Sequence, residues 1–319
     1  MAKLLLGKEV TEALNERIRA RAEALRAKGI VPKLAIIRCG EDPSDLSYER
    51  GAVKRGEAVG VETERLVLPA DADKEAVMSL IRDLNGDDSG QGVLLFRPLP
   101  EHLREYESEI CNTLRPEKDV DCMTHMSQAG VYENLPLGFP PCTPQAVMEI
   151  LDHYGIDVKG KKAAVIGRSL VIGKPAAMML MARHATVAVC HTRTPDVPAI
   201  TKEADIIVTS AGVLGSLTGE FVRPGQTVID VSINWDPALK EGKGGIAGDA
   251  VFDEVEKIAG AVTPVPGGVG AVTTSVLMEH VVTAAERAAG ARAGSGARPV
   301  GLLLGAAGTP CLWSSLLMP

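Results

Sequence analysis

The stretch "AAVIGRSLVIGKPAAMML", residues 163–180, decides the fold of the second half of this 319-residue chain. An apolar run, a glycine-rich turn and a second apolar run follow one another, which predicts a strand, a turn and a helix. Gly167 allows a tight turn, Gly173 lets the backbone approach a ligand, and Pro175 suits the first turn of a helix. The N-terminus of such a helix presents free N–H groups to a phosphate. The spacing is GxSxxxG and not GxGxxG, so a dinucleotide-binding turn and a purely structural turn both remain open.

Strands alternate with helices in both halves of the chain, which predicts an α/β fold with parallel sheets. The Pro-rich passage "LPLGFPPCTPQA" (135–146) interrupts this alternation and marks a hinge or domain edge. The length of the chain also favours about two domains. The expected strands lie at 33–40, 64–69, 92–100, 162–167, 185–190, 204–212, 226–234 and 260–268.

The residues after the expected strand at 185–190 bear on the choice of dinucleotide. In a dinucleotide-binding fold, an acidic residue at this place accepts the ribose 2′-hydroxyl, whereas a basic residue accommodates a 2′-phosphate. This chain has His191, Thr192 and Arg193 here and no acid before Asp196. Arg168 in the glycine-rich turn adds a second cation, so the sequence favours NADP over NAD. The alternative for Arg193 is a solvated loop cation.

The composition excludes several classes of partner. The net charge is −7 and the sequence pI is about 5.5, which argue against a general nucleic-acid or anionic-membrane surface. The six cysteines are scattered without a CxxC pair, and the N-terminus lacks the apolar segment of a signal peptide. We therefore expect a cytoplasmic protein that binds neither nucleic acid nor a membrane. Residues 291–319 are rich in Gly, Ala, Ser and Pro, and we expect a disordered tail there, with a docking segment as the alternative.

Several stretches together resemble the methylenetetrahydrofolate dehydrogenase/cyclohydrolase family, which is usually bifunctional and acts in one-carbon metabolism. They occur in family order across about residues 5 to 288. The matching stretches are "DPSDLSYERGAVKRGEAVGV" (42–61), "GVLLFRPLP" (92–100), "RPEKDVDCM" (115–123), "PPCTP" (140–144), "GRSLVIGKP" (167–175), "ATVAVCHTRT" (185–194) and "TPVPGGVG" (263–270).

The resemblance implies a domain division, a cofactor and an assembly. Residues 1–143 plus 272–290 are expected to form a folate-binding catalytic domain, and residues 144–271 a Rossmann-like NADP-binding domain. The active site is expected in the cleft between them, and the protein is expected to be a homodimer that acts on one-carbon derivatives of tetrahydrofolate.

The resemblance also implies site residues. Tyr48 matches a tyrosine that packs against folate, as an aromatic face suits this ligand. Asp121 matches an aspartate that hydrogen-bonds the pterin ring, whose edge offers a carboxylate two parallel N–H groups; a turn or cap aspartate is the alternative. We predict catalytic roles for both residues. The predicted substrate-binding residues are Tyr48, Asp121, Pro98, Leu99, Pro264, Gly267 and Gly268. The predicted cofactor-binding residues are Gly167, Arg168, Ser169, Gly173, Pro175, His191, Thr192, Arg193, Ala211, Gly212 and Ile233. No metal site is expected.

Two positions depart from the family pattern. The bifunctional members carry Tyr-x-x-x-Lys, whose lysine opens the methenyl ring, but here Ala52 is four residues after Tyr48. Lys54 is rotated by about 240° from Tyr48 around a helix and is expected to point away from the pocket. Phe96 stands where the family has a glutamine. A general-base lysine needs a hydrogen-bonding neighbour, and neither member of that pair is present.

Hydride transfer needs mainly alignment of the two reactants and exclusion of water. The sequence therefore predicts NADP-dependent oxidation of methylenetetrahydrofolate with weak or absent cyclohydrolase activity. The alternatives are a bifunctional dehydrogenase/cyclohydrolase and a non-catalytic folate- or NADP-binding protein. Gln145 stands where the family commonly has glycine, and it either contacts substrate or merely begins a helix.

Overall fold

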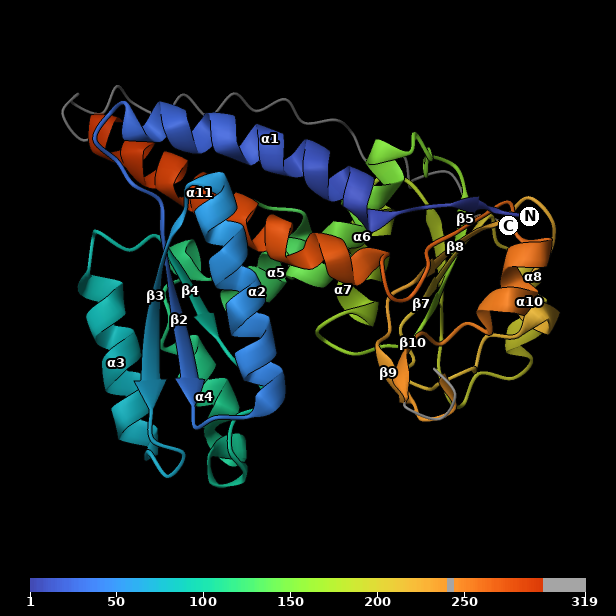
Figure 1. Ribbon diagram of the computed structural model, residues 1–319, viewed down its shortest axis with the longest axis horizontal. Coiled ribbons are helices and arrows are strands. Elements are labelled where there is room, and N and C mark those ends of the chain that lie inside the picture. Colours follow the sequence, from blue (N-terminus) through green and yellow to red (C-terminus); the bar gives the residue numbers. More distant parts are fainter. Residues whose placement is uncertain (240–243, 295–319) are drawn as a thin grey trace, which may run out of the picture.

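The protein folds into a six-stranded parallel sheet and a three-stranded parallel sheet, with helices packed on both (Figure 1). The structure is a computed structural model that describes residues 1–239 and 244–294. The predicted two-domain α/β architecture is confirmed, since each sheet has its own helices and one of them has the order of a doubly wound nucleotide-binding fold.

The strands are β1 (Lys3–Leu4), β2 (Lys33–Cys39), β3 (Glu62–Leu68), β4 (Gly92–Leu95), β5 (Lys162–Ile166), β6 (Thr186–Cys190), β7 (Ile206–Thr209), β8 (Thr227–Asp230), β9 (Asn234–Asp236), β10 (Gly245–Ala247) and β11 (Ala261–Val262). The helices are α1 (Gly7–Arg26), α2 (Pro43–Val59), α3 (Lys74–Gly86), α4 (Glu107–Asn112), α5 (His125–Glu133), α6 (Cys142–His153), α7 (Gly173–Ala182), α8 (Val197–Glu203), α10 (Phe252–Ile258) and α11 (Val269–Gly294). Short 3-10 helices are η1 (Glu101–Tyr106), η2 (Pro116–Lys118) and η3 (Gly219–Phe221).

The smaller sheet has the order β3-β2-β4, so the chain leaves β2 first to one side and then to the other. The helix that follows β2, α2, has clear start and stop signals. The Asp42 side chain accepts a hydrogen bond from the Ser44 N–H at 2.8 Å, Pro43 occupies the first turn, and Gly60 ends the helix with φ +82°. The buried face of α2 then rests on the sheet and on α11.

The larger sheet has the order β1-β11-β8-β7-β5-β6, all parallel. The strand order reverses between β5 and β7, because β6 lies on one side of β5 and β7 on the other. In such sheets, ligands bind beyond the carboxyl ends of the strands at this reversal. The glycine-rich turn follows β5 directly and therefore lies at that point.

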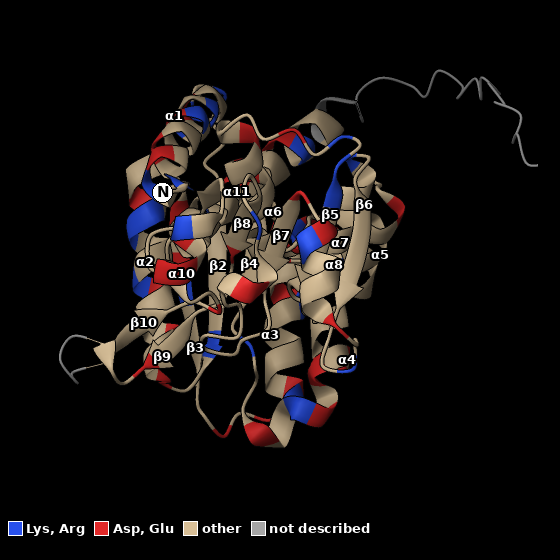
Figure 2. Cartoon of the chain, turned by 90° about the vertical axis from the view of Figure 1, so that its right-hand side faces the viewer, with Lys and Arg blue, Asp and Glu red and all other residues tan. Residues whose placement is uncertain are grey.

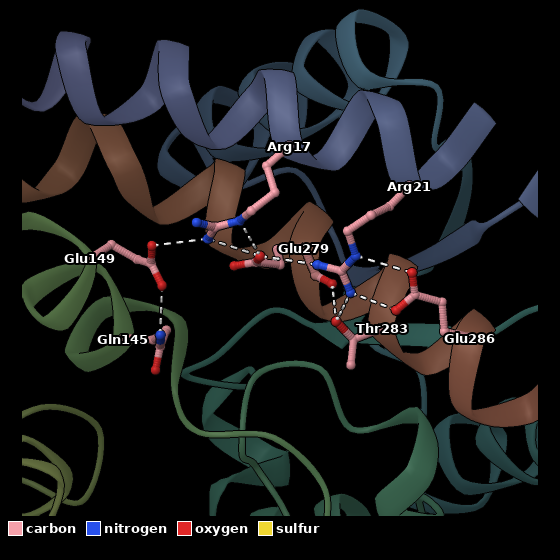
Figure 3. A network of polar contacts seen from close by, with 7 residues as sticks. All are labelled: Arg17, Arg21, Gln145, Glu149, Glu279, Thr283 and Glu286. Atoms are coloured by element: carbon pink, nitrogen blue, oxygen red, sulfur yellow. Dashed lines mark hydrogen bonds and ion pairs between the residues drawn. The ribbon is translucent and has the colours of Figure 1, made fainter. Parts of the chain in front are cut away.

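Three long helices, α1, α6 and α11, connect the two halves, and α1 runs alongside α11 in Figure 1. A network of polar contacts joins them (Figure 3). Arg17 pairs with Glu149 of α6 at 3.0 Å and with Glu279 of α11 at 2.9 Å, and Arg21 pairs with Glu286 at 2.7 Å. Gln145 donates to Glu149 at 2.8 Å. Gln145 thus lies in the first turn of α6, which begins at Cys142, and joins this network.

Three details differ from the sequence-based expectation. Residues 3–4 pair with β11 in the larger sheet, although they fall within the range 1–143 assigned to the folate domain. The expected strand 92–100 ends at Leu95, because Pro98 and Pro100 have no N–H to donate to a neighbouring strand. Helix α11 continues to Gly294, beyond the expected tail boundary at 291, and residues 295–319 lie outside the described part of the chain. The division into 1–143 with 272–290 and 144–271 stays a prediction.

Among the residues that the structure describes, no helix combines the length and the apolar composition needed to span a membrane.

Candidate functional site

A cavity of about 530 Å³ lies at the carboxyl ends of β2 and β4. Its walls come from α2, from the segment after β4, from the region between η2 and α6, and from the glycine-rich turn after β5. Both halves of the chain therefore contribute to one cavity. The lining residues are Ser44, Asp45, Tyr48, Leu94, Leu95, Phe96, Arg97, Pro98, Glu107, Asp121, Pro141, Thr143, Val171 and Thr273.

Tyr48 and Phe96 form an aromatic wall of this cavity. Their ring centroids are 5.7 Å apart and the rings meet edge to face at 88°. This is a favourable geometry for two aromatic rings, because the positive edge of one meets the negative face of the other. The contact fixes the orientation of Tyr48 and leaves an aromatic surface on which a planar ligand can stack.

Asp121 lies in the same cavity and is held by the start of α6. Its Oδ1 accepts a hydrogen bond from the Cys142 N–H at 3.0 Å. Burial raises the pKa of the Asp121 carboxyl, while this hydrogen bond and the charge of Arg97 act in the opposite direction. The neighbouring Asp119 has a structural role instead, since it accepts from the N–H groups of Met123 and Thr124 at 2.9 and 2.8 Å. Asp121 is thus the carboxylate of this segment that faces the cavity.

Two predicted substrate residues near β4 differ in position. Pro98 lines the cavity and follows a cis peptide bond with Arg97. The Leu99 side chain is buried in the core and does not line the cavity, while its N–H donates to Glu107 Oε2 at 3.3 Å. Leu99 therefore supports the wall through its backbone.

The structure places Ala52 and Lys54 of α2 as the helical spacing predicts. Ala52 is fully buried, whereas Lys54 is exposed and does not line the cavity. Phe96 lies beside Tyr48, so an aromatic side chain takes the place next to α2 where a polar partner is expected in the family. No lysine lines this cavity among the described residues.

The glycine-rich turn after β5 is built as the sequence predicts. Gly167 has φ +116°, and a Cβ at Gly173 would lie 2.3 Å from the Gly167 carbonyl oxygen. Ser169 Oγ accepts from the N–H groups of Ile172 and Gly173 at 3.0 and 3.4 Å, and α7 begins at Gly173 with Pro175 in its first turn. Arg168 is exposed beside the turn. The backbone can therefore approach a phosphate closely here.

The other predicted cofactor residues follow the carboxyl ends of β6, β7 and β8, at the same edge of the sheet. His191 donates its N–H to Thr194 Oγ1 at 2.9 Å and accepts from the Arg193 N–H at 3.1 Å, and both Thr192 and Arg193 are exposed. The remaining predicted residues here are Ala211, Gly212 and Ile233, all exposed at this edge. The structure thus brings the whole predicted cofactor set to one edge of one sheet.

Asp249 organises this edge and was missed by sequence reasoning. It is fully buried, and its carboxylate accepts from the N–H groups of Ala211 and Val213 at 2.7 and 2.9 Å and from Ser232 Oγ at 2.8 Å. Ser232 Oγ in turn accepts from the Gly212 N–H at 3.1 Å. A lone "GD" pair in a sequence does not indicate that its carboxylate bridges two loops.

Comparisons with known proteins agree with this geometry. Models of the tetrahydrofolate dehydrogenase/cyclohydrolase catalytic domain and of its NAD(P)-binding domain match residues 5–121 and 141–289. The bifunctional protein FolD of Carboxydothermus hydrogenoformans is 48% identical over 286 residues, which cover 90% of this chain and 98% of that protein. This chain belongs to the tetrahydrofolate dehydrogenase/cyclohydrolase family.

Solved structures of this family have the same fold. The bifunctional FolD methylenetetrahydrofolate dehydrogenase/cyclohydrolase of Campylobacter jejuni is 36% identical, with a TM-score of 0.84 over 90% of this chain and 99% of that one. The Trypanosoma brucei methylenetetrahydrofolate dehydrogenase-cyclohydrolase, solved with NADP and an inhibitor, is 33% identical, with a TM-score of 0.83 over 90% and 98%. The predictions of an enzyme of this family and of an NADP-type dinucleotide cofactor are thereby confirmed at the level of the family.

One predicted set of substrate residues is not gathered in the cavity. Pro264, Gly267 and Gly268 do not line it, and Pro264 instead faces a separate cavity beside Asp230 and the β9–β10 hairpin. The Gly267 carbonyl accepts from the Gly7 N–H at 2.8 Å, so this loop holds the start of α1. Thr273, from the first turns of α11 after this loop, is the residue that reaches the cavity.

The described residues contain no group of three or more His, Cys, Asp or Glu side chains that could hold a metal ion.

Proposed function

We propose that this protein oxidises methylenetetrahydrofolate to methenyltetrahydrofolate by hydride transfer to NADP. The observation that supports this most strongly is the shared cavity. Val171, from the glycine-rich turn of the cofactor half, lines the same cavity as Tyr48 and Asp121 of the other half. A substrate between Tyr48 and Asp121 would therefore lie beside the dinucleotide turn, as a direct hydride transfer requires.

The residues of the cavity suit alignment of the two reactants. The nitrogens next to the methylene carbon of the substrate stabilise the iminium that develops as the hydride leaves, so no protein base is needed at that carbon. Tyr48 offers a face for stacking, and the Asp121 carboxylate accepts two N–H groups of the pterin edge. Holding both reactants in the right orientation accounts for a large part of the barrier reduction in such reactions.

The preference for NADP over NAD rests on two exposed cations. Arg168 and Arg193 follow the carboxyl ends of β5 and β6, which are neighbours in the sheet. A 2′-phosphate bound between these loops would meet both guanidinium groups, which are suited to phosphate. The NADP in the Trypanosoma brucei structure supports the same choice.

For the second step, the comparisons support the bifunctional alternative better than a dehydrogenase with weak cyclohydrolase activity, because the relatives are named as bifunctional. Opening the methenyl ring then requires a general base other than a lysine of α2. The cavity offers two further carboxylates, Asp45 and Glu107. Burial raises the pKa of Asp45, and the charge of Asp42 acts in the same direction, so we propose Asp45 as the base of this step.

A specific observation favours the other candidate, a dehydrogenase with weak or absent cyclohydrolase activity. Ala52 is fully buried where the bifunctional pattern has its lysine, and Phe96 packs against Tyr48 where that pattern has glutamine. Both members of the hydrolytic pair are missing, while the groups proposed for hydride transfer are present.

A single assay distinguishes the two candidates. Purified protein is mixed with methylenetetrahydrofolate and NADP, and NADPH and methenyltetrahydrofolate are followed together at a pH where the latter hydrolyses slowly. Accumulation of methenyltetrahydrofolate in step with NADPH identifies the dehydrogenase. Its consumption faster than in an enzyme-free control identifies the bifunctional enzyme. If no NADPH forms, the proposed function is wrong.

The assembly and location stay proposals as well. We propose a cytoplasmic homodimer that binds neither nucleic acid nor membranes. Support for the homodimer comes from β6, an edge strand of the larger sheet whose residues Ala188 and Val189 are exposed. The net charge of −7 supports the absence of a polyanionic partner, and in Figure 2 the positions of acidic and basic residues are interspersed along the ribbon. Light scattering during size-exclusion chromatography tests the dimer.

A further inference from the structure

Arg97 is a charged residue of the cavity for which the proposed hydride transfer gives no role. It directly follows Phe96, and it lines both the main cavity and an adjoining one of about 260 Å³ that shares Glu107, Asp121, Pro141 and Val171 with it. Arg97 is half-buried. Because it lines both cavities, it lies where they adjoin.

The Arg97 guanidinium forms no hydrogen bond or ion pair with any residue that the structure describes. The two carboxylates that line both cavities together with Arg97 accept hydrogen bonds from other groups: Glu107 accepts from the Leu99 N–H, and Asp121 accepts from the Cys142 N–H. Arg97 and Asp121 form no direct ion pair, although the charge of Arg97 partly opposes the rise in the pKa of the Asp121 carboxyl that burial causes. The N–H donors of the Arg97 guanidinium are thus unpaired, and Arg97 and the Asp121 carboxylate line the same cavities.

The chemistry of a pterin matches this pair of groups. Its edge carries the 2-amino group and N3–H, which are donors, followed directly by the 4-oxo oxygen, which is an acceptor. A carboxylate accepts from the two donors, and a guanidinium beside it is the complementary donor for the oxygen.

We propose that Arg97 is a specificity-determining residue that donates a hydrogen bond to the 4-oxo group of the pterin whose amino edge Asp121 holds. This inference rests on the proposed folate-binding function. It assigns the selection of 4-oxo over 4-amino pteridines to one side chain. A 4-amino group presents N–H donors to the guanidinium, and a buried donor left without its acceptor costs free energy.

The test compares folic acid with 4-amino-4-deoxyfolic acid, which carries an amino group in place of the 4-oxo group and therefore has no N3–H in its neutral form. Affinities of both ligands are measured by titration calorimetry for the wild type and for Arg97→Leu, Arg97→Lys and Arg115→Leu. Arg115→Leu is the matched control, because it removes the same charge from an exposed position in the same half of the chain, where Arg115 contacts Glu117 at 3.5 Å. Thermal unfolding of each variant verifies that it is folded.

The wild type is expected to prefer folic acid, and this preference should fall at least about tenfold in Arg97→Leu, partly recover in Arg97→Lys and stay unchanged in Arg115→Leu. The change in the ratio of the two affinities reports on Arg97 alone. Any difference between the two ligands in their contact with Asp121 is the same in all variants and cancels. An unchanged ratio in Arg97→Leu, or an equal loss of affinity for both ligands, overturns the inference while folate binding stands. Failure of the wild type to bind either pteridine overturns the proposed function itself, and the inference with it.

Discussion

Backbone atoms form most of the candidate cofactor site, whereas side chains form most of the candidate substrate site. Around the turn after β5, Gly167 and Gly173 bring two backbone segments together, and Ser169 Oγ accepts from the N–H groups of Ile172 and Gly173 where the next helix starts. In the cavity after β4, the proposed function depends on the side chains of Tyr48 and Asp121, which both line it. A backbone site is retained as long as its glycines are, but a side-chain site can lose one activity by a single substitution. This difference explains how hydride transfer and ring opening can be separated on one scaffold.

The largest expected effect is on the substrate side. Asp121→Asn keeps the shape of the side chain and an Oδ1 to accept from the Cys142 N–H, but it turns an N–H₂ group toward the donors of the pterin. We expect kcat/KM for methylenetetrahydrofolate to fall by about 100-fold or more. The affinity for NADP, measured by fluorescence titration, should stay unchanged. An equal loss of NADP affinity would mean that the two sites are not separable.

A substitution in the candidate cofactor site should weaken NADP binding and leave folate binding intact. Gly173→Ala places a Cβ 2.3 Å from the Gly167 carbonyl oxygen and 2.8 Å from the Arg168 nitrogen, so the backbone of the turn must shift. We expect the KM for NADP to rise by about 30-fold while folic acid binding is retained. Gly290→Ala, at a helical glycine with no neighbour near the added Cβ, is the control and should leave both unchanged.

These two sites were not equally predictable from the sequence. The cofactor edge follows from local rules, since strand, glycine turn and helix are adjacent in the chain and parallel strands end at one edge. The cavity needed tertiary information. Arg97 and Glu107 line the cavity only because the chain bends after β4. Pro264 lines a different cavity. The role of Asp249 could not be predicted for the same reason, because its partners are distant in sequence and come together only in the folded chain.

A gain of hydrolytic activity should be possible on the substrate side. The double variant Ala52→Lys/Phe96→Gln places a lysine one helical turn after Tyr48 and a polar partner at the cavity-lining position 96. If only these side chains limit the hydrolytic step, consumption of methenyltetrahydrofolate should rise about tenfold over the wild type, since a positioned general base contributes at least this much. Ala52→Met/Phe96→Gln, which adds similar bulk without a base, is the control. Equal rates for the two double variants would show that the lysine does not limit the step.

A smaller effect is expected from the cations beside the turn. Arg193→Asp replaces an exposed guanidinium after β6 by an acid, the residue type that accepts a ribose 2′-hydroxyl. We expect the ratio of kcat/KM for NADP to that for NAD to fall by about tenfold, mostly through KM. Arg183→Asp is a control of the same charge change at the end of α7. If the ratio does not move, Arg193 is only a solvated loop cation.

The smallest effect should come from a change in pH. It should alter the KM for the folate substrate and leave the KM for NADP unaffected. Burial raises the pKa of Asp121, and only the ionised carboxylate accepts two N–H groups. As the pH falls toward this raised pKa, the carboxyl takes up a proton and the KM for substrate should rise, by about threefold per half pH unit below that pKa. The KM for NADP should not follow the same curve, because the turn around Gly167 binds through N–H groups that do not titrate. The Asp121→Asn variant should lose this pH dependence of the substrate KM. If the pH dependence persists in that variant, the titrating group is another one, and Asp45, whose pKa burial also raises, is the first candidate in the cavity.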